Sequence, residues 1–182
     1  VLHQRTWSLD GVLHTLASVR ASDAAASGHV LLRPLAWGWT RLAGAGGPLT
    51  YAQRYDALEW LFGALGVAAL VLMFALVRRR VGAWPAWLAL AGVAMMRCTE
   101  RQITTLDEKP LGMFLFALAV TATDRTLEHA VRRDRSPRLT EALPMGLAWV
   151  LAVAGHLQNA PFAAASLLAL VTAFRGPGRW RR

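Results

Sequence analysis

The stretch ALEWLFGALGVAALVLMFALV, residues 57–77, is the strongest structural signal in the sequence. Apart from Glu59 near its start, it contains no charged residue. As a helix with a rise of 1.5 Å per residue, it is about 31 Å long. This length matches the hydrocarbon core of a bilayer, which is about 30 Å thick. The sequence therefore predicts a membrane-spanning helix over residues 57–77.

The composition of the whole chain favours a polytopic membrane protein. Of the 182 residues, 55% are hydrophobic, and the mean hydropathy of +0.34 is well above that of an ordinary soluble domain. The net charge is +9, but the basic residues follow the apolar segments instead of gathering on one soluble face, so we expect no nucleic-acid partner. The single cysteine, Cys98, excludes an internal disulfide and a cysteine-based metal cluster.

Four further apolar segments follow the first. Residues 82–96 and 111–123 are shorter than the ~20 residues of a normal span, so each must borrow flanking residues or lie in a thinned, protein-lined region. Residues 144–174 are interrupted by GHLQNAP at 155–161, which predicts two short helices joined by a turn. A single 31-residue span is the alternative. The predicted fold is all-α, a polytopic membrane helical bundle with about five membrane segments over residues 57–182.

Arginine-rich stretches orient these segments, because cytoplasmic loops retain Lys and Arg. Residues 78–80, 125–138 and 175–182 are rich in arginine and fall on one side if every segment crosses. Residues 97–110 carry three basic and three acidic residues, as expected of an external loop. We therefore expect the chain to lie in a cell membrane, such as a bacterial inner membrane. The arginine-rich loops and the C-terminus would be cytoplasmic.

Residues 1–56 are predicted to form an external region with two helices that lie in the membrane interface. The first follows Ser8 and Asp10 as candidate N-caps and carries an apolar stripe. The second has Pro34 in its first turn. It would present apolar and aromatic residues at headgroup depth, namely Leu35, Trp37, Trp39 and Leu42.

The order of these features resembles a family of membrane enzymes. An acidic residue in the first loop, in SLDG at 8–11, is followed by GHVLLRPL at 28–35 and by the long apolar segment that ends in RRR. KPLGMFLFALAV at 109–120 and AGHLQNAPFAAASLLALV at 154–171 complete the layout. Together they resemble the N-terminal half of C-type membrane glycosyltransferases, which include protein O-mannosyltransferase-like enzymes. The resemblance implies that sugar is taken from a polyprenyl-phosphate-linked donor at the external face, and that the chain is part of a longer protein.

Glycosyl transfer requires a base for the acceptor hydroxyl and neutralisation of the leaving phosphate. The resemblance identifies Asp10 as the catalytic acidic residue of the first loop. Its carboxylate would act as the general base or as a metal ligand. A divalent metal ion is a cofactor that this chemistry allows, although the sequence does not identify its ligands. Asp10 is equally suited to cap the helix that follows it, which is the alternative interpretation.

Two pairs of substrate-binding candidates lie in the predicted external loops. His29 and Arg33 are four residues apart and would share one helix face toward a phosphate or an acceptor. In the alternative, Arg33 snorkels to lipid headgroups and His29 ends a loop. Glu100 and Asp107 belong to the second external loop, where acidic residues are also typical of a solvated surface.

The last pair, His156 and Gln158, lies in the GHLQNAP turn. These two side chains and that of the neighbouring Asn159 are suited to hydrogen-bond phosphate or sugar oxygens, because polar residues at membrane depth are functional candidates. A turn also needs polar groups to satisfy its own backbone. The alternative function for the chain is a noncatalytic multipass membrane protein, such as a transporter subunit or a scaffold. A glycine-rich phosphate loop, a nucleophile elbow and a zinc-ligand spacing are all absent from the sequence.

Overall fold

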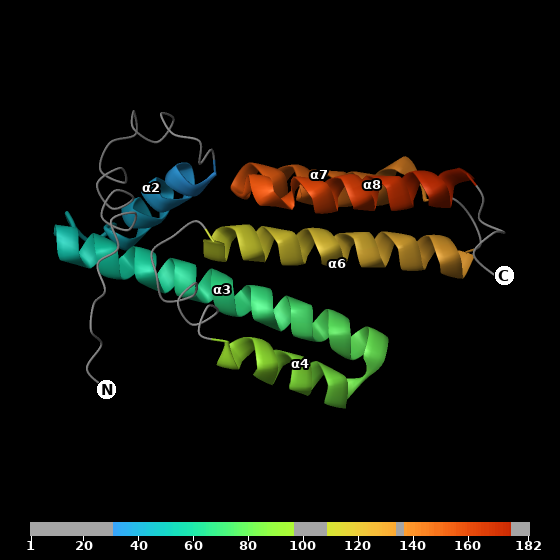
Figure 1. The fold of residues 1–182 in the computed structure, drawn as a ribbon. Coiled ribbons are helices and arrows are strands. Elements are labelled where there is room, and N and C mark those ends of the chain that lie inside the picture. Colours follow the sequence, from blue (N-terminus) through green and yellow to red (C-terminus); the bar gives the residue numbers. More distant parts are fainter. Residues whose placement is uncertain (1–30, 97–108, 134–136, 176–182) are drawn as a thin grey trace.

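A computed structural model describes residues 31–96, 109–133 and 137–175. Every regular element in these ranges is helical (Figure 1). The elements are α2 (Leu32–Ala43), α3 (Tyr51–Val81), α4 (Ala83–Met95), α6 (Lys109–Arg133), α7 (Leu139–Gly155), the short 3-10 helix η2 (Leu157–Asn159) and α8 (Ala160–Arg175). The predicted all-α fold class is therefore confirmed for the described part of the chain.

Helix α3 contains the whole of the predicted 57–77 span. It begins with a capping box, in which the Thr50 backbone N–H donates to Gln53 Oε1 at 2.9 Å and the Gln53 N–H donates to Thr50 Oγ1 at 3.3 Å. Among the described helices, α3 is the one that is long and apolar enough to cross a membrane, whereas α4, α7 and residues 160–172 of α8 are shorter apolar helices. The expectation of five membrane segments stays a prediction for the others.

Successive long helices run in alternating directions (Figure 1). Gly82 alone separates α3 from α4, and its φ of +102° is one that glycine adopts without strain. Helix α6 lies between α3 on one side and the pair α7 and α8 on the other, while α2 crosses the beginning of α3. The end of α3, the end of α6 and the beginning of α7 therefore share one end of the bundle. We call it the arginine-rich end, after Arg78–Arg80, Arg125, Arg132, Arg133 and Arg138.

The opposite end of the bundle holds the residues at which the predicted external loops begin and end (Figure 1). Helix α3 begins there at Tyr51, α4 ends there at Met95, and α6 begins there at Lys109. Residues 156–159, between α7 and α8, lie at the same end, which we call the turn end. The break between α7 and α8 confirms the predicted pair of short helices, so the single 31-residue helix was the wrong alternative.

Helix α6 is much longer than its apolar stretch at residues 111–123. It includes both flanks and continues for ten residues, seven of them polar or charged, to Arg133. The helix thus extends beyond the apolar segment on both sides, while its role as a membrane span stays a prediction. Threonine hydroxyls at positions 121, 123 and 126 donate to the carbonyls four residues earlier, which satisfies these polar groups within the helix.

The core is centred on α6 and its contacts with α3 and α7. Its largest buried apolar residues include Leu32, Leu58, Phe62, Leu111, Leu115, Met145 and Trp149. Two glycines allow α6 and α7 to approach closely. A Cβ at Gly112 would lie 2.8 Å from His156 Cβ, and one at Gly155 would lie 2.5 Å from Leu115 Cδ1.

Large apolar side chains also cover the outside of the bundle. They include Trp60 at 78% exposure and Trp84 at 79%, followed by Leu88, Leu147, Val150 and Leu168. In α2, Pro34 occupies the first turn as predicted. Trp39 is exposed and its Nε1 donates to the Ala57 carbonyl at 2.7 Å, whereas Trp37 is half-buried.

Candidate functional site

The structure brings together the two predicted site residues of the turn end. His156 ends α7 and is half-buried, and its Nε2 lies 3.0 Å from Oε1 of the exposed Gln158. The tautomer with a proton on Nε2 donates this hydrogen bond. The pair therefore forms a small polar surface that can offer the Gln158 amide N–H to an oxygen ligand.

The neighbouring Asn159, which the sequence offered as a further hydrogen-bond donor to phosphate or sugar, instead holds the turn in place. It is buried, and its Nδ2 donates to the Ala152 carbonyl at 2.9 Å and approaches the Gly112 carbonyl at 3.5 Å. Ala152 lies in the last turn of α7, and its carbonyl also accepts a hydrogen bond from the His156 backbone N–H at 3.0 Å. Asn159 thus closes the end of α7 and links the turn to α6, which is a structural role.

The other predicted site residues lie outside what the structure describes. Asp10, His29, Glu100 and Asp107 fall outside the described residues. Arg33 belongs to the first turn of α2, but its side chain is also outside the described part. His156 and Gln158 are therefore the two site predictions whose geometry is visible.

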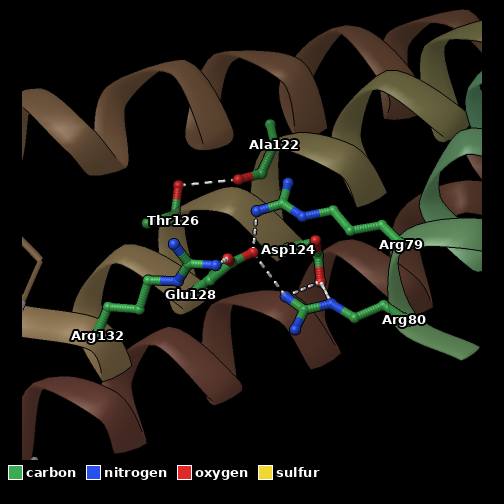
Figure 2. A network of polar contacts seen from close by, with 7 residues as sticks. All are labelled: Arg79, Arg80, Ala122, Asp124, Thr126, Glu128 and Arg132. Atoms are coloured by element: carbon green, nitrogen blue, oxygen red, sulfur yellow. Dashed lines mark hydrogen bonds and ion pairs between the residues drawn. The ribbon is translucent and has the colours of Figure 1, made fainter.

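A second group of polar residues, at the arginine-rich end, joins α3 to α6 (Figure 2). The buried Glu128 of α6 accepts hydrogen bonds from Arg79 and Arg80 of α3, with Arg80 Nη2 lying 3.2 Å from Glu128 Oε2. Arg132, one turn further along α6, lies 2.6 Å from Glu128 Oε1. Arg80 Nε also donates to Asp124 Oδ1 at 2.7 Å. Three arginines therefore surround two carboxylates.

These arginines keep the Glu128 carboxyl ionised. They hold its pKa below the ordinary value of 4.5, chiefly because Arg79 donates a hydrogen bond to the carboxylate, and this effect outweighs the opposing effect of desolvation. Glu128 lies five residues beyond the apolar stretch 111–123, and so outside that segment. A carboxylate that cations hold in the ionised form is a poor proton acceptor. The cluster is therefore suited to fixing α3 against α6 and not to general-base catalysis.

Sequence reasoning treated the arginines at 78–80 only as markers of sidedness and missed their partners. A signal for the partners was present, because Asp124, Glu128 and Arg132 are spaced by four residues and share one helix face.

Polar pairs also join α6 to α7. Trp149 Nε1 donates to Thr123 Oγ1 at 2.9 Å, and the Thr126 hydroxyl lies 3.2 Å from the Glu141 carbonyl.

Two of the cavities between the described helices differ in character. The first has a volume of about 300 Å³ and lies between α3, α4 and α6, where its lining is apolar and includes Phe74 and Phe116. The second has a volume of about 430 Å³ and lies between α3, α6 and α7, with a partly polar lining. Neither is lined by His156 or Gln158.

The described residues contain no group of three or more His, Cys, Asp or Glu side chains that could hold a metal ion. Comparisons with protein-family models, with curated proteins and with solved structures found no match to the chain.

Proposed function

We propose that the chain is the membrane-embedded N-terminal part of a glycosyltransferase that takes a sugar from a polyprenyl-phosphate donor at the external membrane face. The observation that carries the proposal is the separation of the two ends of the bundle. Arginine-rich segments gather at one end, while the described residues that flank the predicted external loops gather at the other (Figure 1). One face of a membrane would thus hold the predicted site residues.

The surface of the bundle supports the membrane placement. In the most apolar window of α3, only 17% of the residues are buried inside the bundle. Large apolar side chains are exposed on α4, α7 and α8 as well, including Trp84, Leu147 and Leu168. An exposed apolar surface of this extent is unusual for a soluble monomer and fits contact with lipid tails.

The charge distribution supports the proposed orientation. Positive residues are retained on the cytoplasmic side of membrane proteins, which would place the arginine-rich end there. The flanks of residues 97–108, Met96 and Lys109, belong to the turn end together with His156 and Gln158. Glu100 and Asp107, within that stretch, would then face the same side as the turn. The external face would combine carboxylates with hydrogen-bond donors.

In the proposed reaction, Asp10 accepts the proton of the acceptor hydroxyl or binds a divalent metal ion. His29 and Arg33 contact the leaving phosphate, whose negative charge they would balance. Gln158 donates a hydrogen bond from its amide to a sugar or phosphate oxygen. These roles follow from the resemblance and from the chemistry of the side chains.

The test is the substitution Asp10→Asn in the full-length protein, with transfer of radiolabelled sugar from a polyprenyl-phosphate donor as the readout. We expect a ~10²- to 10⁴-fold loss of rate, because that is the usual contribution of a positioned general base. Asn is as good an N-cap as Asp, so folding should be unchanged. Asp23→Asn, in the same N-terminal region, is the matched control and should keep the wild-type rate. Wild-type transfer by the Asp10 variant would remove Asp10 from the site.

The second candidate is a noncatalytic multipass membrane protein. The observation that favours it is the self-contained turn end, where His156 pairs with Gln158 and Asn159 bonds the backbone. If the protein is noncatalytic, the rate of sugar transfer in membranes that contain it should be the same for the wild type and for Asp10→Asn. The further substitutions Glu100→Gln and Asp107→Asn should also leave this rate unchanged.

A further inference from the structure

The cavity between α3, α6 and α7 is apolar in one part and basic in another. Leu72 of α3, Leu118 of α6 and Pro144 of α7 provide its apolar part. Arg125 and His129, both of α6, provide the basic part at the arginine-rich end. Its volume of about 430 Å³ lies within the range of small-molecule sites, about 300–1,000 Å³. The lining of this cavity suits an amphiphile.

The two parts belong to one stripe of α6. Leu118, Ala122, Arg125 and His129 are spaced by four, three and four residues, so they lie along one face of the helix, and all four line the cavity. The stripe changes from apolar to basic just beyond Thr123, where the apolar stretch of α6 ends. In the proposed membrane this point is the boundary between lipid tails and headgroups.

The basic residues of this stripe are available to a ligand. Arg125 and His129 are exposed, and in the described part of the chain neither has an ion-pair partner. The ion-pair cluster lies on the neighbouring face of α6, about 100° away, and differs because each of its charged side chains has an ion-pair partner (Figure 2). The free positive charge of this face of α6 is therefore directed to the cavity.

One carboxylate, that of Glu141, also lines the cavity, but its oxygens are occupied. Oε1 accepts from Arg133 Nη1 at 2.8 Å, and Oε2 accepts from the Arg138 backbone N–H at 2.9 Å. The Arg133 guanidinium offsets its charge. The net uncompensated charge around the cavity is therefore positive and suits an anion.

We propose that this cavity binds one anionic phospholipid. An acyl chain lies against Leu72, Leu118 and Pro144, and the phosphate lies beside Arg125 and His129. The inference rests on the membrane placement proposed above but not on sugar transfer. Basic pockets between helices on the cytoplasmic side of membrane proteins bind anionic headgroups in this way. The apolar cavity between α3, α4 and α6 has no cationic residue in its lining and is not part of the proposal.

Native mass spectrometry of the detergent-purified protein tests the proposal. The probes are phosphatidylglycerol and phosphatidylcholine with identical acyl chains, and free inorganic phosphate. We expect the wild type to retain one phosphatidylglycerol in preference to phosphatidylcholine. Arg125→Gln should weaken that binding roughly fivefold, as expected for one basic residue at a membrane surface, and the double variant with His129→Gln should weaken it further. Leu118→Trp should reduce binding of both lipids by filling the apolar part.

Matched controls distinguish lipid binding in this cavity from lipid binding caused by the overall positive charge and hydrophobicity of the bundle. Arg78→Gln removes an exposed arginine of the same end that lines neither cavity, and Leu147→Trp enlarges an exposed leucine on α7. Both controls should bind like the wild type, and circular dichroism should show unchanged helix content in all variants.

Three results would overturn the proposal: equal retention of the two lipids, equal weakening by Arg78→Gln and Arg125→Gln, or displacement of phosphatidylglycerol by an equal concentration of inorganic phosphate. The last result would indicate an anion site without a chain. Because no sugar donor is present, a failure of the proposed enzymatic function would not alter this measurement.

Discussion

The two ends of the bundle are held by polar residues that act in different ways. At the arginine-rich end, charged side chains of different helices bind each other, as Glu128 does with Arg79, Arg80 and Arg132. At the turn end, Asn159 binds backbone carbonyls and Gly112 allows a close approach of His156. The first kind of contact depends on charge, and hence on pH and salt. The second depends on shape and on backbone hydrogen bonds.

Exposure determines how much each kind contributes to stability. The arginine side chains around Glu128 are 43–74% exposed, so water and salt screen their attraction to the carboxylate. At the turn end Asn159 and Gly112 are buried, and a buried polar group without a partner costs about 1–3 kcal/mol. Changes at the turn end should therefore have the larger effect on the stability of the fold.

The largest effect on stability is expected for Gly112→Ala. The new Cβ would lie 2.8 Å from His156 Cβ, an atom that cannot move without its backbone. Overpacking of this kind costs about 1–3 kcal/mol, which outweighs the gain of up to ~1 kcal/mol from replacing glycine by alanine in a helix. Thermal unfolding in detergent should show a lower melting temperature than that of the wild type, and the size of this decrease should be independent of pH and salt.

Gly146→Ala is the matched control for that substitution. Gly146 is on α7, and a Cβ there would have no neighbouring atom within 4 Å, so only the gain in helix propensity remains. We expect an unchanged or slightly higher melting temperature. If Gly112→Ala were as stable as Gly146→Ala, the close approach of α6 to the turn would be contradicted.

A smaller effect, with a different pH dependence, is expected for Glu128→Gln. Arg79 and its neighbours hold the pKa of Glu128 below its ordinary value of 4.5, so the carboxylate contributes stability above pH 4.5. That contribution is lost as the pH falls below 4.5 and through the lower pKa of the folded state. The difference in melting temperature between wild type and variant should be constant from pH 7 to about 5 and should shrink below pH 4.5. High salt should shrink it as well.

The control for the charged end is Glu59→Gln. Glu59 has no ion pair among the described residues, so this variant should melt like the wild type at every pH. A melting temperature of Glu128→Gln equal to that of Glu59→Gln would mean that the arginine cluster does not stabilise the bundle.

The local features of the fold could be predicted from the sequence. The helix over residues 57–77 follows from an uninterrupted apolar length, and the break at 156–159 follows from polar residues and Pro161 within an apolar stretch. The continuation of α6 to Arg133 could not be predicted from hydropathy, because seven of the ten residues 124–133 are polar or charged. Their helix is supported by ion pairs whose formation depends on how α3 is placed against α6.

The candidate site was predictable only where the partners are close in sequence. His156 and Gln158 are two residues apart, and their contact at 3.0 Å needs only a tight turn. The sequence suggested Asn159 as a ligand donor, whereas its structural role depends on the carbonyls of Ala152 and Gly112, the second of which is 47 residues away in sequence. The joint placement of Asp10, His29, Glu100 and Asp107 stays a prediction.

Whether the two ends face opposite sides of a membrane can be measured with the single native thiol, Cys98, three residues after the end of α4. An impermeant maleimide should label wild-type Cys98 in intact cells. In a Cys98→Ser background, a cysteine introduced by Arg78→Cys at the arginine-rich end should be labelled only after the membrane is permeabilised. Labelling of both positions from the same side would contradict the proposed topology and, with it, the external site.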